Sequence, residues 1–364
     1  MPKIKQVPED FIVREIFEKQ VTKEGWKSEN EAYVWFDLTK RNYDLFRCLK
    51  LLSRRLNVSI KRFGYAGTKD KLGITKQKIS VWNVPVERLK DIRFKDIELS
   101  NFEINNERIN LGDLKGNEFE IAIRDIEKSD LKRIEKKLDN IRKNGFINFY
   151  GEQRFGIRGD THLVGKEILK NNLKEAVWLY LAHRGEENNE VAEFRKKLAE
   201  SQDVKEGLKN CPKFLRNEII LMNHLIQKSN DYAGALRRLP KKFRTMLVHA
   251  YQSYLWNEVA KVSKEEVIPL IGFNTDLTKY KTGEQIEKIL ERENVKITDF
   301  KIRSMPELSC EGSERERMAK ARGMKWRFAG DELNEGKLKC VLEFEIPKGS
   351  YATVLLDEIL KAVE

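Results

Sequence analysis

The residue best suited to chemistry in this chain is a single carboxylate in a short run that contains three glycines. The run at 64–77 reads GYAGTKDKLGITKQ and places Asp70 between Lys69 and Lys71. Adjacent ammonium groups favour the charged form of a carboxylate, so the spacing predicts an ionised acid beside a phosphate-bearing ligand. An ordinary Lys-Asp turn between two strands accounts for the same residues equally well, because glycine, aspartate and threonine are common in turns.

Two other enzyme chemistries fit this run poorly. A phosphate-binding P-loop needs two glycines separated by four residues and followed directly by Lys and Ser or Thr. Here Gly64 and Gly67 are three apart, and Thr68 precedes Lys69. A metal-dependent nuclease needs several acids around a cation, and the run supplies one. The four cysteines and four histidines of the chain are scattered without metal-ligand spacing. We therefore expect neither a metal nor a cofactor.

A second run, NFYGEQRFGIRG at 148–159, interleaves aromatic, glycine and arginine residues. Asn148 offers hydrogen bonds, Tyr150 a ring for stacking, and Arg154 a partner for phosphate. A protein that works on an extruded base needs such a set, because the base must stack on a ring once it leaves the helix. If Phe149 and Tyr150 lie on a strand, they face opposite sides, so one can be core while the other lines a cleft. The alternative is a strand end with two buried rings and a surface arginine.

The elements that must position these runs alternate between strand and helix in the first 160 residues, which indicates an α+β fold. Alternating or β-branched patterns predict strands at 11–17, 31–38, 76–82, 97–104 and 118–126, and helical spacing predicts helices at 43–56, after Pro85 and at 131–143. The tail returns to this style, with a strand at 338–347 and a helix at 351–363. One strand and one helix cannot bury a core alone, so the tail should complete the N-terminal sheet.

The middle of the chain reads as a series of helices. In the longest, at about 242–262, apolar residues recur every fourth position and include Tyr251 and Leu255, which we expect in the core. Gln252, Ser253 and Asn257 lie on the other side of that helix, where contact with RNA is possible. The predicted organisation is a discontinuous catalytic domain, 1–160 with 305–364, interrupted by a mainly helical inserted domain, 161–304.

The composition favours a polyanionic partner. The 364 residues carry 70 basic and 58 acidic side chains, a formal net charge of +12, and such an excess is typical of nucleic-acid binding, although a merely basic protein has the same balance. No segment approaches the roughly 20 apolar residues of a membrane span, and the N-terminus lacks the apolar core of a signal peptide. We expect a cytoplasmic monomer that does not bind membranes.

Six segments of the chain carry a family resemblance. In order along the sequence they are PEDFIVREI, AGTKDKLGITKQ, NLGDLKGNEFEIAIR, NFYGEQRFG, HAYQSYLWNEV and FEIPKGSYATVLLDEIL. They resemble the successive signatures of the TruD family of tRNA pseudouridine synthases, from about Lys5 to Leu360. The resemblance implies a pseudouridine synthase catalytic fold with a mixed or antiparallel sheet, interrupted by a family-specific inserted domain.

The resemblance also implies roles for individual residues. Asp70 matches the catalytic aspartate, and Lys5 matches the lysine expected to pair with it. Asn148 matches the polar residue beside the target nucleotide, and Tyr150 matches the aromatic residue that stacks on the uracil. Many family members have NYFG where this chain has NFYG, so a tyrosine replaces phenylalanine at the stacking position. Arg154 is expected to bind the substrate as well.

The implied reaction is the conversion of a uridine in tRNA, U13 by resemblance, into pseudouridine. The N1–C1′ bond breaks, the base turns and a C5–C1′ bond forms, which needs no net redox change, hydrolysis or energy input. An anionic Asp70 can attack C1′, attack C6 of the ring, or assist proton loss in a glycal route, and the sequence does not choose among them. The alternative function is a non-catalytic RNA-binding or RNA-folding protein, for which Asp70→Asn keeps both binding and cellular role.

Overall fold

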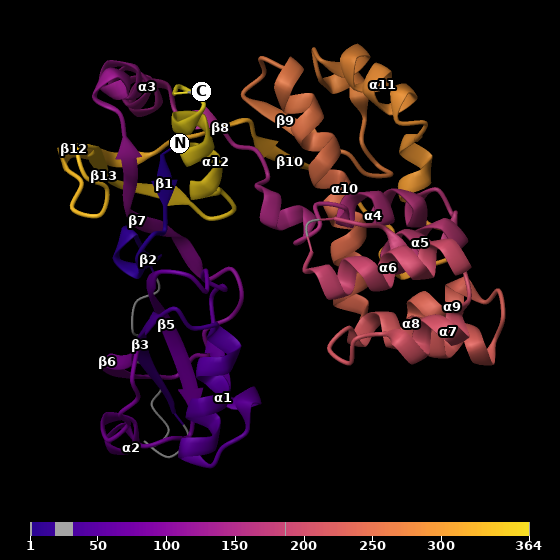
Figure 1. Cartoon of the computed structure of the whole chain (residues 1–364), viewed down its shortest axis with the longest axis horizontal. Coiled ribbons are helices and arrows are strands. Elements are labelled where there is room, and N and C mark those ends of the chain that lie inside the picture. Colours follow the sequence, from indigo (N-terminus) through magenta and orange to yellow (C-terminus); the bar gives the residue numbers. More distant parts are fainter. Residues whose placement is uncertain (1, 19–31, 186, 364) are drawn as a thin grey trace. The chain divides into compact units, whose positions relative to one another are not determined.

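The computed structural model describes residues 2–18, 32–185 and 187–363, and the chain forms two compact units (Figure 1). Unit 1 comprises residues 1–146 and 319–364, and unit 2 comprises residues 147–318. The domain boundaries expected from the sequence, at 160/161 and 304/305, both lie inside unit 2. Of the predicted strand at 31–38, residue 31 lies outside the described part of the chain.

The described part of unit 1 contains one nine-stranded sheet, with the order β12-β13-β7-β2-β5-β3-β6 and with β1 added to β7 and β4 to β5. The strands are β1 (Lys3–Ile4), β2 (Phe11–Phe17), β3 (Tyr33–Arg41), β4 (Phe63–Tyr65), β5 (Ile74–Trp82), β6 (Ile97–Asn105), β7 (Leu114–Ile126), β12 (Arg322–Gly330) and β13 (Leu338–Pro347). The pair β2–β5 is parallel and its neighbours along the sheet are antiparallel. The sheet is therefore mixed, as expected for an α+β fold.

The C-terminal tail completes the N-terminal sheet, which confirms the sequence prediction. Strand β13 pairs antiparallel with β7 and sets Phe344 opposite Phe119, with the two rings stacked at 5.4 Å between centroids. Helices α3 (Leu131–Asn144) and α12 (Ala352–Leu360) pack on this part of the sheet and share one apolar core with β2, β7 and β13. Two segments that are far apart in sequence thus share one core within unit 1.

A second core in unit 1 lies around β3 and β5. Helix α1 (Leu45–Leu56) begins after Asp44, whose side chain accepts a hydrogen bond from the Arg47 backbone N–H, an N-cap that stabilises a first turn. The leucine stripe predicted from the sequence is buried, from Leu45 to Leu56. The short helix α2 (Val86–Lys90) follows Pro85 and adds Leu89 to the same core.

Unit 2 is mainly helical. Its helices are α4 (Thr161–Leu169), α5 (Leu173–Ala182), α6 (Asn189–Ser201), α7 (Val204–Asn210), α8 (Arg216–Gln227), α9 (Tyr232–Arg238), α10 (Lys241–Val262) and α11 (Gly283–Arg292), and its paired strands are β9 (Val267–Leu270) and β10 (Ser313–Glu316). Strands β9 and β10 were not predicted, because β9 contains Pro269 and β10 reads SERE without apolar alternation. The chain passes between the units at the short strands β8 (Phe146–Ile147) and β11 (Met318–Ala319).

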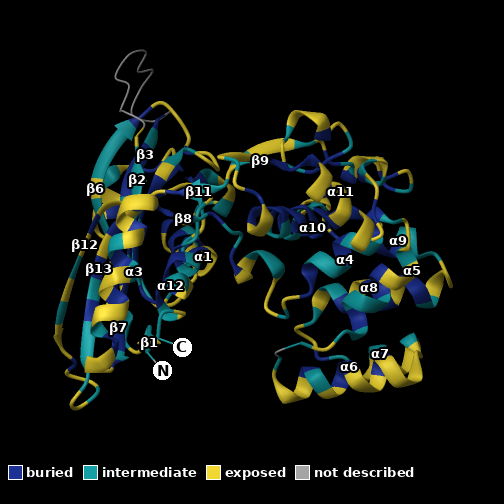
Figure 2. Cartoon of the chain, turned by 90° about the horizontal axis from the view of Figure 1, so that it is seen from above, coloured by how far each residue is buried: buried dark blue, intermediate teal, exposed yellow. Residues whose placement is uncertain are grey.

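Helix α10 runs through the core of unit 2, and Figure 2 shows it largely buried. Tyr251 and Leu255 are fully buried, as predicted. Of the three polar residues of this helix for which contact with RNA was considered possible, Gln252 and Ser253 are buried too. The Gln252 amide donates to the Ile271 carbonyl at 2.8 Å. The reason is that neighbouring elements cover most of the circumference of α10, so its polar side chains bond within the unit.

Among the described residues, no helix has the length and apolar content needed to cross a bilayer.

Candidate active site

Asp70 lies in unit 1, in the loop of residues 66–73 between β4 and β5. Side chains from the neighbouring strands hold the backbone of this loop. The ammonium group of Lys40 donates to the Asp70 carbonyl at 2.6 Å, and the Gln77 amide donates to the Gly67 carbonyl at 2.9 Å. Because these bonds fix the main chain itself, the position of the Asp70 side chain follows from the surrounding sheet.

The far end of the loop is fixed by Gly73. Its N–H donates to the side-chain oxygen of Asn42 at 3.0 Å, and its carbonyl accepts from the Asn42 N–H at 2.9 Å. Gly73 has φ +109°, and a Cβ added there would lie 2.3 Å from the carbonyl oxygen of Phe11. Only glycine fits, because both the left-handed conformation and the close approach exclude a side chain.

Lys5 meets Asp70 within unit 1. Its ammonium nitrogen lies 3.4 Å from Oδ2 of Asp70, and the two side chains are 20% and 27% exposed. The same nitrogen lies 3.9 Å from the centroid of the Phe11 ring. Lys5 has φ +61°, so the chain turns sharply directly after β1. The structure thus brings together the lysine and the aspartate that the resemblance pairs.

Lys69, which precedes Asp70 in the sequence, forms an ion pair with another carboxylate. The Lys69 ammonium group lies 2.5 Å from a carboxylate oxygen of Glu15 on β2, and both side chains are almost fully buried. A buried ion pair of this kind is costly to break, because the remaining charge has no partner. Lys69 therefore ties the loop to β2 on one side while Asp70 points to Lys5 on the other.

Lys40 is a site residue that the sequence analysis missed. Its side chain is fully buried, and burial lowers its pKa because desolvation disfavours the ammonium form, while the charges of Cys48 and Asp70 act in the opposite direction. One signal was present in the sequence. Lys40 follows Phe36 and Leu38 in the alternation of β3, and both of those residues are buried, so it is a lysine at a core position.

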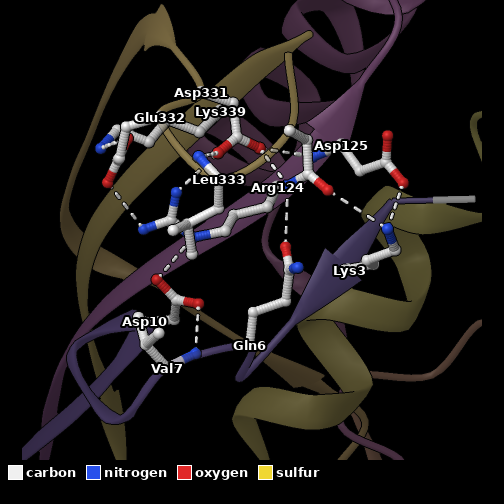
Figure 3. Close-up of polar contacts among 11 residues, drawn as sticks. Lys3, Gln6, Val7, Asp10, Arg124, Asp125, Asp331, Glu332, Leu333 and Lys339 are labelled. Atoms are coloured by element: carbon white, nitrogen blue, oxygen red, sulfur yellow. Dashed lines mark hydrogen bonds and ion pairs between the residues drawn. The ribbon is translucent and has the colours of Figure 1, made fainter.

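An ion network around Arg124 positions the segment that carries Lys5 (Figure 3). Arg124 on β7 donates to Asp10 at 2.7 Å and to Asp331 at 2.7 Å. The second oxygen of Asp10 accepts from the Val7 N–H at 3.0 Å, which closes the turn before the short 3₁₀ helix Pro8–Asp10. The side chains of Arg124, Asp10 and Asp331 are at most 5% exposed. This network anchors the chain directly after Lys5.

The outer part of the network reaches solvent. Glu332 accepts from Arg124 at 3.0 Å and from Lys339 at 2.5 Å, and these hydrogen bonds lower its pKa to about 2. Burial alone would lower the pKa of Arg124, but the bonds to Glu332, Asp10 and Asp331 outweigh it and raise that pKa. For Asp331, burial raises the pKa, but hydrogen bonds from the Asp125 N–H and other donors outweigh this effect. The net result is a lowered pKa. The network is therefore built around ionised groups.

The second predicted set of residues lies in unit 2 and begins with Asn148. Its side chain is largely buried, with the amide Nδ2 donating to the Glu316 carbonyl at 3.2 Å and Oδ1 accepting from Arg315 at 2.7 Å. Arg315 also donates to the Asn148 carbonyl at 3.0 Å. Asn148 is therefore held by β10, a strand that comes much later in the sequence.

Tyr150 is held by its backbone and by neighbouring rings and cations. Its N–H donates to the Asn257 side chain at 2.8 Å, and its carbonyl accepts from the same side chain at 3.0 Å. The Arg315 guanidinium lies 4.2 Å from the centre of the Tyr150 ring, and Trp256 meets the ring edge-on at 5.7 Å. Residues 148–151 form no strand, and Phe149 and Tyr150 both pack partly buried against the core of unit 2, so the expectation of opposite strand faces is wrong.

Arg154 lies in the 3₁₀ helix η5 (Glu152–Phe155), next to Tyr150. Its Nε donates to the Ser253 hydroxyl at 2.9 Å, and its guanidinium lies 5.6 Å from the centre of the Tyr150 ring. Arg315 and Trp256 were missed by the sequence analysis, because neither belongs to the run at 148–159 and no local pattern connects them to it. Each predicted residue thus has a defined setting within its own unit: Lys5 and Asp70 in unit 1, Asn148, Tyr150 and Arg154 in unit 2.

Among the described residues, no group of three or more His, Cys, Asp or Glu side chains is arranged to hold a metal ion. The buried thiols of Cys48, Cys310 and Cys340 have raised pKa values because burial disfavours the thiolate.

The chain was compared with known proteins. The family described as "tRNA pseudouridine synthase D (TruD)" matches residues 2–268 and 259–359. A protein of Methanococcoides burtonii named "Probable tRNA pseudouridine synthase D" is 36% identical, over 99% of this chain and 93% of its own. A protein of the same name from Methanosarcina acetivorans is 37% identical, over 99% and 92%. A solved structure described as a TruD from Methanosarcina mazei superposes with a TM-score of 0.82 at 35% identity, covering 99% of this chain and 93% of the other. The chain therefore belongs to the tRNA pseudouridine synthase D (TruD) family.

Proposed function

We propose that this protein isomerises a uridine of tRNA, U13, to pseudouridine, with Asp70 as the catalytic aspartate. The observation that carries the proposal is the pairing of Asp70 with Lys5, whose ammonium nitrogen lies 3.4 Å from the carboxylate. Asp70 itself lies on a loop whose main chain is fixed by Lys40, Gln77 and Asn42. A carboxylate held in this way is available to a substrate without reorganisation of the protein. The names of the relatives support the substrate and the reaction class.

The reaction asks little more of the protein than one anionic carboxylate. The ammonium group of Lys5 lies 3.4 Å from the Asp70 carboxylate, and Coulomb attraction between two such charges is stronger in a partly dry site than in water. The carboxylate then acts at C1′, at C6 or on the proton lost in a glycal route while the N1–C1′ bond breaks and the C5–C1′ bond forms. Each route keeps Asp70 anionic at the first step, so Lys5 serves all three.

Asn148, Tyr150 and Arg154 are proposed to bind the substrate. The ring of Tyr150 is held by Asn257 through its main chain, so it can serve as a preformed stacking platform for a flipped uracil. Flipping a base costs a few kcal/mol, and stacking on an aromatic ring offsets part of that cost. The net charge of +12 supplies the sequence-independent attraction to the tRNA backbone.

The test is release of tritium from tRNA labelled at uracil C5, with no metal or nucleotide added. Wild type should release tritium, and Asp70→Ala and Asp70→Asn should release none while still binding the tRNA. A transcript in which U13 is replaced by cytidine should release none with the wild-type protein. Tight binding of a broad panel of tRNAs without release from any would instead favour the non-catalytic RNA-binding function.

A further inference from the structure

A pocket of about 680 Å³ lies within unit 2 and is not used by any step of the proposed reaction. It is lined by η5, by the turn at 156–159, by the first turn of α4, by α10 and by the segment after α5, through the residues Glu152, Phe155, Gly156, Ile157, Arg158, Gly159, His162, Arg184, Gly185 and Tyr254. Its volume is in the range of pockets that bury small organic ligands, 300 to 1,000 Å³ in order of magnitude.

Three aromatic rings form one wall of this pocket. His162 stacks on Tyr254 with 4.7 Å between ring centroids and 23° between planes, and Phe155 meets His162 edge-on at 5.3 Å. Burial lowers the pKa of His162, because desolvation disfavours the imidazolium form, so the ring is neutral near pH 7 and acts as an aromatic surface. Phe155 does not belong to the apolar core of unit 2, and its ring is in partial contact with solvent.

The rim combines an exposed apolar side chain with charge. Ile157 is 92% exposed, between Gly156 and Gly159, which both have φ in the left-handed region. Arg184 is exposed as well. Arg158 is different, since it lies 3.2 Å from Asp160 and donates to two main-chain carbonyls, so it builds the wall. The carboxylate of Glu152 adds an acceptor for N–H groups of a base.

The pocket is continuous with the residues around Tyr150. Arg154 and Phe155 are neighbours in η5, and Ser253 and Tyr254 are neighbours in α10. The hydrogen bond from Arg154 to Ser253, 2.9 Å long, ties the two elements together. An RNA strand that reaches Tyr150 therefore lies close to the pocket through rigid structure, and a second unpaired nucleotide of the same strand is the occupant that this continuity favours.

We propose that this pocket binds a second unpaired nucleotide of the RNA substrate, distinct from the target uridine. Its base stacks on the ring of Phe155, and His162, whose plane lies at 75° to that ring, borders the base at its edge. Ile157 covers the exposed side of the base, and Arg184 lies close to its phosphate. This inference rests on the proposed function in taking RNA as the partner and in placing the target uridine at Tyr150. Aromatic walls with a nearby arginine are typical of sites for single-stranded nucleotides, because every base has a π-face and every linkage a negative charge.

The first measurement is the Kd of an unmodified tRNA transcript for matched variants of the full chain. Phe155→Ala should weaken binding by about 5- to 150-fold, the range for removing a base-stacking ring, and Phe155→Tyr should keep it within about twofold. Arg184→Ala should reduce the slope of log Kd against log salt concentration by about 1, the value for one lost phosphate contact. Arg216→Ala, another exposed arginine of unit 2 that does not line the pocket, should leave both quantities unchanged.

The second measurement identifies the bound nucleotide. A photo-crosslinking amino acid (p-benzoylphenylalanine) at position 157 should crosslink one nucleotide of the tRNA other than the target uridine, and the same group at position 214, also exposed in unit 2, should not. The absence of a crosslink above that control, a crosslink to the target uridine alone, or unchanged binding in Phe155→Ala would each overturn the proposal. Crosslinking and the Phe155→Ala defect without any tritium release by wild type would refute the proposed function and leave the pocket assignment standing.

Discussion

Replacing Arg124 by methionine should destabilise unit 1 strongly. The substitution keeps an unbranched side chain but leaves Asp10 and Asp331 as buried carboxylates without their shared cation. Breaking a buried ion pair by removing one partner costs about 3–5 kcal/mol. For a unit of this size about 1 kcal/mol corresponds to about 2–4 °C, so the melting temperature should fall by about 6–20 °C. The control Arg133→Met removes an exposed arginine of an i,i+3 pair and should cost at most about 1 kcal/mol.

The pH dependence of this loss tests its electrostatic cause. The pKa of Asp331 is lowered in the folded protein, so its contribution to stability is present above its ordinary pKa of 3.8 and is lost as the pH falls toward the folded value. Wild type should therefore lose stability on acidification below about pH 5. In Arg124→Met, Asp331 has lost this cation and takes up a proton more readily, so the difference in stability between variant and wild type should narrow in that range. Urea titrations at pH 7, 5 and 4 measure it, and a gap below 1 kcal/mol at pH 7, or one independent of pH, would refute the reasoning.

Three further perturbations separate activity from stability. Lys40→Met removes the donor to the Asp70 carbonyl, so kcat for tritium release should fall at least tenfold. It also replaces a buried charge by an apolar group, so the melting temperature should stay level or rise. A large fall in melting temperature would contradict this reasoning. Gly73→Ala should cost more than about 1 kcal/mol in urea unfolding, because φ is positive and Phe11 blocks the Cβ. Tyr150→Phe should preserve tRNA affinity and Tyr150→Ala should weaken it by about 1–3 kcal/mol in a filter-binding assay, and equal affinities would exclude stacking.

The sequence predicted those elements whose periodicity is set by burial on one side. The helix at 43–56 and the strands at 11–17 and 338–347 match α1, β2 and β13 to within two residues. Strand β12 was not predicted, because it lies at the edge of the sheet and most of its side chains are partly or fully exposed, which removes the apolar alternation. Local patterns therefore identified the elements with a buried face and missed the exposed edge strand.

The residues around the site divide in the same way. Asp70 was found because its neighbours include turn-forming glycines within a few positions. The partners of Arg124 are 114 and 207 residues away, and Arg315 bonds to Asn148 across 167 residues. No pattern within a short window contains such pairs, and only the completed topology of each unit brings them together.

The central position of β7 has a consequence for synthesis of the chain. Strand β7 pairs with β1 and β2 from the N-terminal end and with β13 from the C-terminal end, and all of unit 2 is encoded between them. On the ribosome, at about 5–20 residues per second, the contiguous unit 2 is therefore available to fold before β13 exists. Asp331 is also made late. It accepts a hydrogen bond from Arg124, and Arg124 in turn bonds to Asp10, which closes the turn after Lys5. The segment that carries Lys5 thus gains its full support only near the end of translation, so we expect a chain that ends before Asp331 to be inactive.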